Sequence, residues 1–271
     1  MENDFSLKDK VIVVTGGTGV LGGAFVNGII KAGGTVGILG RNEKVAAERM
    51  SGIINEGGKA IVLIADVTDK QQLLYARDKM IAKYGKIDGL VNSAGGNIPD
   101  AVLQKNQNIF QLNTAALQQV MQVNLFGTIL PTQIFGEAIK NNGTGSIVNI
   151  SSITSQLAVT KVLGYSLSKA AIDSYTKWFA VELAKRFGDK IRMNAIAPGF
   201  FLTKQNKTLL TKDDGSLTER GNLIINKTPF NRFGNPDELI GALVWLLSDA
   251  SKFVTGTIIK VDGGFSAYSG V

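Results

Sequence analysis

The chain has 271 residues, of which 44% are hydrophobic and 19% are charged, a composition typical of a folded globular protein rather than a disordered one. It contains no cysteine and no histidine, which excludes disulfides, metal sites built from thiolate or imidazole ligands, and Ser-His-Asp catalysis. Any acid–base chemistry must therefore use Tyr, Lys, Asp or Glu.

The net charge of +7 comes from lysines and arginines that are scattered along the chain, without a basic run interleaved with aromatic residues. We therefore do not expect nucleic-acid binding. The amino-terminal stretch MENDFSLKDK lacks the apolar core of a signal peptide, and no apolar stretch approaches the roughly 18 residues that a membrane span needs. These features predict a cytoplasmic protein that does not bind membranes.

Seven short apolar runs alternate with longer helical patterns. The predicted strands are 10–15, 35–39, 60–65, 87–91, 145–150, 191–196 and 257–261. They lack strict polar alternation, as do parallel strands that are buried on both faces. The predicted helices are 20–32, 43–55, 70–84, 117–140, 165–187 and 236–247. This order predicts an α/β fold, a Rossmann-type doubly wound sheet of seven parallel strands with helices on both faces.

Two polar segments interrupt this alternation, 96–114 after the fourth strand and 200–234 after the sixth. Neither shows a further strand–helix unit, so a single domain over residues 1–271 is predicted. Ligands of such sheets bind beyond the carboxyl ends of the strands, and both segments should border the site. The second has the length and polarity of a substrate lid, at about 200–234.

The first strand runs into a glycine-rich turn that opens the first helix, residues 15–22 with the sequence TGGTGVLG. Such a turn lets backbone N–H groups approach a pyrophosphate at the positive end of the helix dipole. A plain strand-to-helix connection is the alternative. The position at the first strand of a β-α-β unit favours dinucleotide binding.

Tyr165 and Lys169 lie four residues apart, on one face of a predicted helix. An ammonium near a phenol favours the phenolate, so Lys169 is expected to lower the pKa of Tyr165. The hydroxyl could then donate or accept a proton near neutral pH. Taken alone, the Tyr-x-x-x-Lys pattern also fits a surface pair.

The whole chain resembles the short-chain dehydrogenase/reductase family, through eight marks that occur in the family's order. They are the glycine turn at 15–22, Asp66-Val67, Asn92-Ser93-Ala94-Gly95, Asn124, Ser151-Ser152, Tyr165-x-x-x-Lys169, Pro198-Gly199 through Thr203, and Asp262-Gly263-Gly264. Ser152 stands 13 residues before Tyr165, the family's separation of catalytic serine and tyrosine. The resemblance therefore favours Ser152 over Ser151.

The resemblance implies an NAD(P)-dependent oxidoreductase that interconverts a carbonyl and a secondary alcohol by hydride transfer, without a metal ion. Tyr165 would exchange the proton, Lys169 would lower its pKa and hold the nicotinamide ribose, and Ser152 would bind the carbonyl oxygen. Asn124 would hold Lys169 through a water-linked proton path. The cofactor-binding residues implied are Gly16, Thr18, Gly19, Val20, Leu21, Gly22, Arg41, Asp66, Val67, Asn92, Ala94, Gly95, Tyr165, Lys169, Pro198, Gly199 and Thr203.

The turn departs from the family pattern at Val20, where a glycine is usual, and Gly19 is expected to supply the missing backbone freedom one residue earlier. The same variant turn is found in a subgroup similar to D-mannonate oxidoreductases, also called fructuronate reductases. The stretch Ala94-Gly95-Gly96-Asn97 and the tail 263–271 also resemble that subgroup.

Cofactor choice is expected to depend on the residue after the second strand, where an acid would bind the adenosine ribose and exclude a 2′-phosphate. Gly40 occupies this position and Arg41 follows it, which favours NADP(H). NAD(H) is the alternative, with Arg41 stacked on adenine. Asp66 is expected to face the adenine amino group. Asn92, together with the backbone of Ala94-Gly95, is expected to line the side of the adenosine ribose.

The substrate-binding residues expected are Asn97, Ser152, Thr154 and Lys161, with lid residues Asn231 and Arg232 as further contacts. Lys161 would pair with the carboxylate of a sugar acid. The favoured reaction interconverts D-fructuronate and D-mannonate. Another carbonyl reductase, for ketoacyl, polyol or xenobiotic substrates, is one alternative, and a non-catalytic NAD(P)-binding sensor is another.

The two long predicted helices, 117–140 and 165–187, carry apolar residues on more faces than one sheet contact can bury. These residues include Leu125, Phe126, Ile129, Trp178 and Phe179. Together with the family resemblance they predict a homotetramer, with the tail 265–271 near a subunit boundary.

Overall fold

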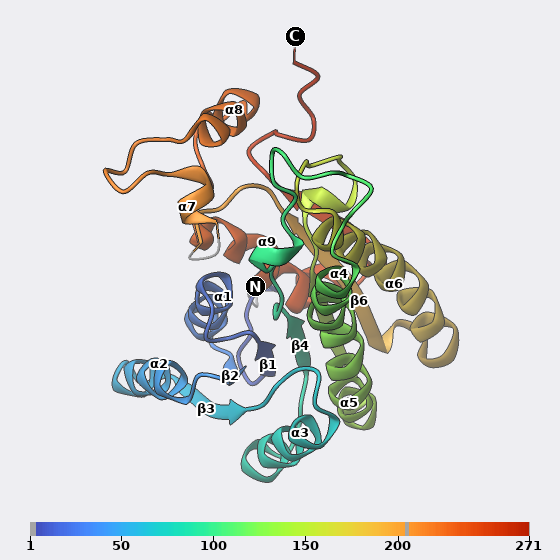
Figure 1. Ribbon diagram of the computed structural model, residues 1–271. Helices are drawn as coiled ribbons and strands as arrows, with labels where there is room; N and C mark the ends of the chain where they lie inside the picture. Colours follow the sequence, from blue (N-terminus) through green and yellow to red (C-terminus); the bar gives the residue numbers. More distant parts are fainter. Residues whose placement is uncertain (1–3, 204–205, 271) are drawn as a thin grey trace.

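The computed structural model describes residues 4–203 and 206–270, and one parallel sheet of seven strands runs through this part of the chain (Figure 1). The strands are β1 (Val11–Thr15), β2 (Thr35–Gly40), β3 (Lys59–Ile64), β4 (Gly89–Asn92), β5 (Gly145–Ile150), β6 (Ile191–Pro198) and β7 (Ile258–Val261). Their order is β3-β2-β1-β4-β5-β6-β7. The chain reverses direction across the sheet between β1 and β4, which opens a crevice at the carboxyl ends of these strands.

Helices cover both faces of the sheet, as predicted. They are α1 (Val20–Lys31), α2 (Glu43–Asn55), α3 (Lys70–Tyr84), α4 (Thr114–Met121), α5 (Gly127–Asn142), α6 (Leu163–Phe187), α7 (Lys207–Leu210), α8 (Glu219–Lys227) and α9 (Ile240–Leu247). Short 3₁₀ turns add η1 (Pro99–Ala101), η3 (Ile153–Ser155), η4 (Gly188–Lys190), η5 (Pro236–Leu239) and η6 (Asp249–Ser251).

The side chains of each central strand alternate between two hydrophobic cores. In β1, Val13 packs in the core beneath α3, α5 and α6, while Ile12 and Val14 pack in the core beneath α1, α2 and α9. Phe135 and Phe25 are fully buried in the first and second core, respectively. Burial on both faces explains why these strands show apolar runs rather than alternation.

The helix predicted at 117–140 is interrupted in the structure. A π-helical segment, η2 (Gln122–Phe126), separates α4 from α5. The side chain of Asn124 bonds to the backbone at Val120, one turn earlier, and the hydroxyl of Thr128 donates to the Asn124 carbonyl oxygen at 2.8 Å. Such π segments often occur at functional sites.

The segment 200–234 was expected to contain no further strand–helix unit; its described part contains the helices α7 and α8 and no strand. Leu210 of α7 and Ile224 of α8 pack with Ile153 and Phe265, in a small core of their own. In Figure 1 these two helices lie above α1 in the view, beyond the carboxyl ends of the strands. The two helices have only 4 and 9 residues and lie in a polar segment, so the sequence pattern did not show them.

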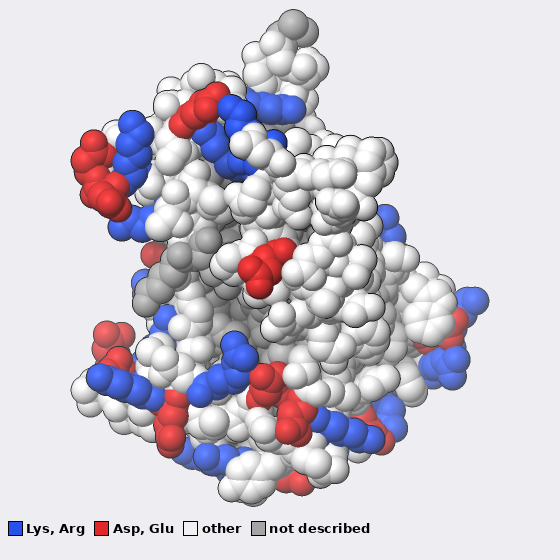
Figure 2. All heavy atoms as spheres, viewed as in Figure 1, with Lys and Arg blue, Asp and Glu red and all other residues white. Residues whose placement is uncertain are grey.

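No helix in the described ranges is long and apolar enough to cross a membrane. On the face drawn in Figure 2, lysines and arginines are interspersed with aspartates and glutamates around the rim, and the centre carries few charges. The charge of the chain therefore does not form a basic stripe on this face.

Candidate active site

The predicted cofactor and catalytic residues come together at one edge of the sheet, at the carboxyl ends of the strands. The glycine turn follows β1, Arg41 follows β2, and Asp66 follows β3. Asn92 ends β4, Ser152 follows β5, and Pro198 ends β6. Parallel pairing of β1 with β4, and of β4 with β5, brings three of these strand ends side by side.

The turn after β1 is shaped by close backbone contacts. Gly16 adopts a φ of +64°, and a Cβ on it would lie 2.8 Å from the Cα of Ala94. A Cβ on Gly22 would overlap the carbonyl oxygen of Gly16 and approach its carbonyl carbon to 2.8 Å. Only glycine fits at these two positions, so the turn forms a narrow backbone cradle at the start of α1, the type of site that binds phosphate groups.

Gly19 does not provide the backbone freedom that was expected of it. Its φ of −77° and ψ of 179° are extended values that any residue adopts, and Val20 begins α1 with ordinary helical geometry. The departure from the family pattern at Val20 is therefore accommodated without a special backbone conformation.

The end of β4 is tied to this turn by Thr15. The Thr15 hydroxyl accepts hydrogen bonds from the amides of Ser93 and Ala94, at 3.1 and 3.2 Å. The Ser93 hydroxyl donates to the Thr15 carbonyl oxygen at 2.8 Å. These bonds hold the Ala94-Gly95 backbone beside the glycine turn.

Tyr165 and Lys169 lie on one face of α6, with the Lys169 Nζ 5.4 Å from the centre of the Tyr165 ring. The ring packs against a small cluster formed by Ala101, Ala116 and Val120. The Tyr165 hydroxyl is hydrogen-bonded to Ser152. Lys169 is 4% exposed, and its Nζ donates to the carbonyl oxygen of Ile150 at 2.8 Å.

The expected effect of Lys169 on Tyr165 is not the dominant one in this structure. Burial raises the pKa of Tyr165, and the hydrogen bond with Ser152 only partly offsets the rise. Burial also lowers the pKa of Lys169 to about 8, although the nearby Asp173 carboxylate raises it. The phenol is therefore held in its protonated form, which suits a proton donor.

Asn124 is fully buried and uses its amide to hold the neighbouring loop. Its Nδ2 donates to the carbonyl oxygens of Gly96 and Val120, at 2.7 and 2.8 Å, and its Oδ1 accepts from the Gly96 amide at 3.0 Å. A Cβ on Gly95 would lie 2.5 Å from this Oδ1 and 3.6 Å from the Lys169 Nζ. Asn124 and Lys169 thus both adjoin Gly95, and the predicted water-linked path between them stays a prediction.

Asp173 is a residue that the sequence reasoning missed. Its buried carboxylate accepts hydrogen bonds from the hydroxyls of Ser151 and Ser155, at 2.5 and 2.6 Å, and from Gln156 at 3.3 Å. It therefore anchors the loop that carries Ser152 to α6. The signal was its place four residues after Lys169 on the same helix.

The four predicted substrate residues differ in their surroundings. Both polar side-chain atoms of Asn97, and the Thr154 hydroxyl, are buried and have no hydrogen-bond partner in the described part of the chain. The Thr154 amide donates to the Ser152 hydroxyl at 3.2 Å. Lys161 is exposed, with a φ of +75°, and its carbonyl oxygen accepts from the Leu103 amide.

Two predicted cofactor residues make hydrogen bonds within the protein, and their contacts with the adenosine stay predictions. Asn92 is only 2% exposed, and its Nδ2 donates to Thr132 of α5 and to Asn149 of β5, so its side chain links the end of β4 to both elements. Asp66 accepts from both the amide and the hydroxyl of Thr68, and from the Arg41 guanidinium at 3.3 Å. These bonds outweigh the effect of burial and lower the pKa of Asp66.

The expected lid contact Arg232 is engaged elsewhere. Its guanidinium binds both carboxylate oxygens of Glu238, at 2.8 and 2.6 Å. This hydrogen bonding lowers the pKa of Glu238 to about 2, and Glu238 in turn caps η5 together with Asn235. Arg232 thus connects the end of the segment 200–234 to η5, which precedes α9.

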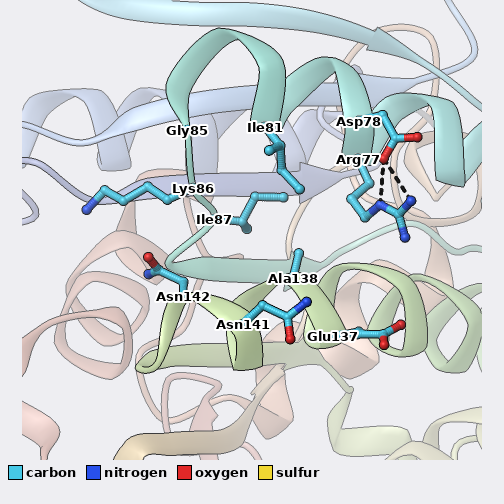
Figure 3. Close-up of a pocket in the computed structure, with 10 residues that line it drawn as sticks. All are labelled: Arg77, Asp78, Ile81, Gly85, Lys86, Ile87, Glu137, Ala138, Asn141 and Asn142. Carbon is cyan, nitrogen blue, oxygen red and sulfur yellow. Dashed lines mark hydrogen bonds and ion pairs between the residues drawn. The ribbon is translucent and has the colours of Figure 1, made fainter.

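A groove of about 490 Å³ lies at the opposite edge of the sheet (Figure 3). It is formed where α3 and α5 end, and the side chains of Ile81, Lys86, Asn142 and Glu137 line it. The segments that contain Lys86 and Asn142 lead into the amino ends of β4 and β5. This groove is therefore separate from the cluster around Tyr165.

No group of three or more acidic ligands among residues 4–203 and 206–270 is placed to hold a metal ion.

A family model described as enoyl-(acyl carrier protein) reductase matches residues 19–266. The chain belongs to the short-chain dehydrogenase/reductase family. UxuB of Bacillus subtilis strain 168, described as an uncharacterized oxidoreductase, is 40% identical to this member of the family over 275 residues, 98% of each chain.

Two solved structures add to this comparison. A protein of Haemophilus influenzae with bound NAD, provisionally assigned as a D-mannonate oxidoreductase, has a TM-score of 0.89 and 38% identity over 98% of each chain. A gluconate 5-dehydrogenase of Burkholderia cenocepacia J2315, in complex with NADP and tartrate, has a TM-score of 0.85 and 32% identity over 98% of each chain. The predicted fold and the predicted class, an NAD(P)-dependent short-chain oxidoreductase, are confirmed.

Proposed function

We propose that this short-chain dehydrogenase/reductase interconverts a keto sugar acid and its hydroxy acid, with D-fructuronate and D-mannonate as the substrate pair. The observation that carries the proposal is a set of buried polar side-chain atoms, on Asn97 and Thr154, that have no hydrogen-bond partner in the described part of the chain, with Thr154 bonded through its amide to Ser152. A buried polar group without a partner costs about 1–3 kcal/mol, so these groups favour a ligand rich in hydroxyls. The likeness to the provisionally assigned D-mannonate oxidoreductase supports the same substrate class.

The residues would divide the chemistry as follows. When bound, the nicotinamide supplies or accepts the hydride. Tyr165, held protonated by burial, donates its proton to the carbonyl oxygen as negative charge develops there, and Ser152 donates a hydrogen bond to the same oxygen. Lys169, whose Nζ donates to the Ile150 carbonyl oxygen, would bind the nicotinamide ribose, and Asn124 holds the loop at Gly96.

The direct test is an assay of the purified protein with D-fructuronate and D-mannonate and with both cofactors. A panel of ketoacyl, polyol and simple ketone substrates serves as the comparison. Turnover of the sugar-acid pair with the highest kcat/KM is the expected result. Turnover confined to the comparison panel would favour another carbonyl reductase of the family, and binding of NAD(P)H without turnover of any substrate would favour a sensor.

Lys161 provides a sharper test of the acid substrate. Replacing it with methionine should raise KM for fructuronate up to roughly fivefold if the side chain stays as exposed as it is here, because exposed ion pairs are weak. A larger rise would indicate that α7 and α8 close over the pair as a lid. Steady-state kinetics on a neutral sugar ketone of similar size should show little change.

Lys140→Met is the matched control, since Lys140 is an exposed lysine near the far end of α5. It should leave KM for both substrates unchanged. If Lys161→Met raises KM equally for the acid and for the neutral ketone, Lys161 has a structural role and does not contact the substrate carboxylate.

We propose NADP(H) as the preferred cofactor, with NAD(H) as the alternative. Gly40 leaves the end of β2 without a carboxylate, and the Arg41 side chain beside it is 78% exposed, so its guanidinium is accessible to a 2′-phosphate in addition to its ion pair with Asp66. Arg41→Ala should weaken the binding of NADPH roughly tenfold, the low end expected for loss of a charge-assisted hydrogen bond. The binding of NADH should be nearly unchanged. Dissociation constants from calorimetry would check this, and equal losses would reduce Arg41 to a neighbour of adenine.

We propose that this protein assembles as a homotetramer through α5, the η2 segment before it, and α6. Phe126, just before α5, is 50% exposed, and Trp178 and Val181 of α6 are 62% and 53% exposed. Large exposed apolar side chains on η2 and α6, two segments that pack against each other, are typical of a subunit interface. Light scattering at micromolar concentration should give a mass near four chains, and a monomer would contradict the proposal.

A further inference from the structure

Arg49 reaches from α2 to the glycine turn after β1. Its Nη1 donates to the carbonyl oxygen of Gly17, and its Nη2 donates to that of Gly19 at 2.9 Å. The guanidinium forms no ion pair with a carboxylate in the described part of the chain. One side chain thus holds two carbonyl groups of the turn and brings an unneutralised positive charge to it.

The first turn of α1 leaves room for this guanidinium. Gly23 is buried, and a Cβ on it would lie 2.5 Å from the Arg49 Cζ and 2.6 Å from its Nη2. Any larger residue at position 23 would therefore push the guanidinium away while meeting only the end of a flexible side chain. Gly23 and Arg49 fit as a pair, although they are 26 residues apart and belong to different helices.

The geometry of the peptide bond links these contacts to the face of the turn that would bind the cofactor. In a trans peptide the C=O and N–H groups point in opposite directions. Holding the carbonyl oxygens of Gly17 and Gly19 toward Arg49 therefore turns the amides of Thr18 and Val20 toward the other side of the turn. Neither amide is bonded to an acceptor among residues 4–203 and 206–270. Val20 is also the first residue of α1, at the positive end of the helix dipole.

We propose that Arg49 is a positioning residue that fixes the amides of Thr18 and Val20 toward the cofactor pyrophosphate. The contact holds the turn from the α2 side, opposite the face on which these two amides lie. Because the pyrophosphate is common to both nicotinamide cofactors, Arg49 acts on NADH and NADPH alike. Arg41, in contrast, is assigned to the 2′-phosphate. The proposal rests on the cofactor site of the proposed function, but not on the identity of the substrate.

Three variants test the clamp, with cofactor dissociation constants from calorimetry as the main readout. Arg49→Met should raise the dissociation constants of NADH and NADPH by the same factor, roughly 10- to 100-fold, because two charge-assisted hydrogen bonds that order the turn are lost. Arg49→Lys, which can reach only one carbonyl oxygen well, should give an intermediate loss. Gly23→Ala should weaken the binding of both cofactors by the same factor, because the new Cβ displaces the Arg49 guanidinium although Arg49 itself is unchanged.

Further measurements separate positioning from a role in folding alone. Gly52→Ala, on the same helix as Arg49 and with nothing within 4 Å of the new Cβ, should bind both cofactors like the wild type. At saturating cofactor, kcat of Arg49→Met should stay near the wild-type value, because Tyr165 and Lys169 are undisturbed. The melting temperature of the cofactor-free variants shows whether each one is folded, and Arg49→Lys and Gly23→Ala remain available if Arg49→Met is not.

Unchanged dissociation constants in folded Arg49→Met and Gly23→Ala would overturn the proposal and leave Arg49 a structural link between α2 and the turn. A loss confined to NADPH would also overturn it, since Arg49 would then contact the 2′-phosphate. A wild-type protein that binds neither cofactor would instead contradict the cofactor site itself. Failure of the sugar-acid assay alone would leave these binding results intact.

Discussion

Replacing Tyr165 with phenylalanine should reduce turnover by roughly 10²- to 10⁴-fold, the contribution usual for a positioned general acid. The ring would still fill its place against Ala116 and Val120, so the change removes the hydroxyl and little else. Cofactor affinity should therefore stay within a few-fold of the wild type. Single-turnover measurements of NAD(P)H oxidation with a carbonyl substrate, beside calorimetric dissociation constants, would check both expectations.

Tyr175→Phe is the matched control for this substitution. Tyr175 lies on the same helix and packs against Phe179, with ring centres 5.2 Å apart, in the core beneath α6. Loss of its hydroxyl should leave the rate of the chemical step unchanged. A Tyr165→Phe variant that keeps more than about a tenth of the wild-type rate would remove Tyr165 from the proton-transfer role.

The pH dependence of the reduction should follow the same arrangement. Burial lowers the pKa of Lys169 to about 8, so its positive charge is present below that pH and is lost above it. Because burial keeps Tyr165 protonated in the lower range, the reduction rate should be highest below about pH 8 and fall as the pH rises through it. The Asp173 carboxylate raises the pKa of Lys169. In Asp173→Asn the reduction rate should therefore begin to fall at a lower pH than in the wild type.

The elements of the fold were predictable where local chemistry marked them. The helices 43–55 and 70–84 were predicted with the bounds that the structure shows, because Asn42 and Asp69 cap their first turns and Gly85 ends the second in a left-handed conformation. The strands were visible as apolar runs because both of their faces are buried. The π-helical break at Asn124 was not visible, since its hydrophobic pattern continues from α4 into α5.

The candidate site was predictable as a set of residue types at fixed spacings, but not as a network. Tyr165 and Lys169 are four residues apart, so their shared face followed from helix geometry. Arg49 and Asp173 act through contacts between elements that the fold brings together. No motif marks Arg49, and the spacing of Asp173 from Lys169 does not reveal the serines that it binds. The predicted direction of the shift in the pKa of Tyr165 was wrong for a related reason. It depends on burial by Ala101, Ala116 and Val120, which a sequence pattern does not show.

Gly22→Ala should abolish useful cofactor binding. The added Cβ would overlap the carbonyl oxygen of Gly16, and would lie 2.8 Å from its carbonyl carbon and 3.1 Å from the Cα of Gly17. All three atoms belong to the backbone, so the turn itself must move to make room, and the amides at the start of α1 would lose their common orientation. Overpacking of this kind costs about 1–3 kcal/mol or more, so both dissociation constants should rise by roughly 10- to 100-fold or beyond.

Gly19→Ala is the graded control within the same turn. Its Cβ would meet only the Gly16 carbonyl oxygen, at 3.2 Å, and its φ of −77° suits alanine. Binding should therefore weaken by a few-fold at most. The circular dichroism and melting temperature of both variants show whether the fold survives. If folded Gly22→Ala binds NADH and NADPH like the wild type, the pyrophosphate does not occupy this turn, and the roles proposed for Thr18, Val20 and Arg49 fail with it.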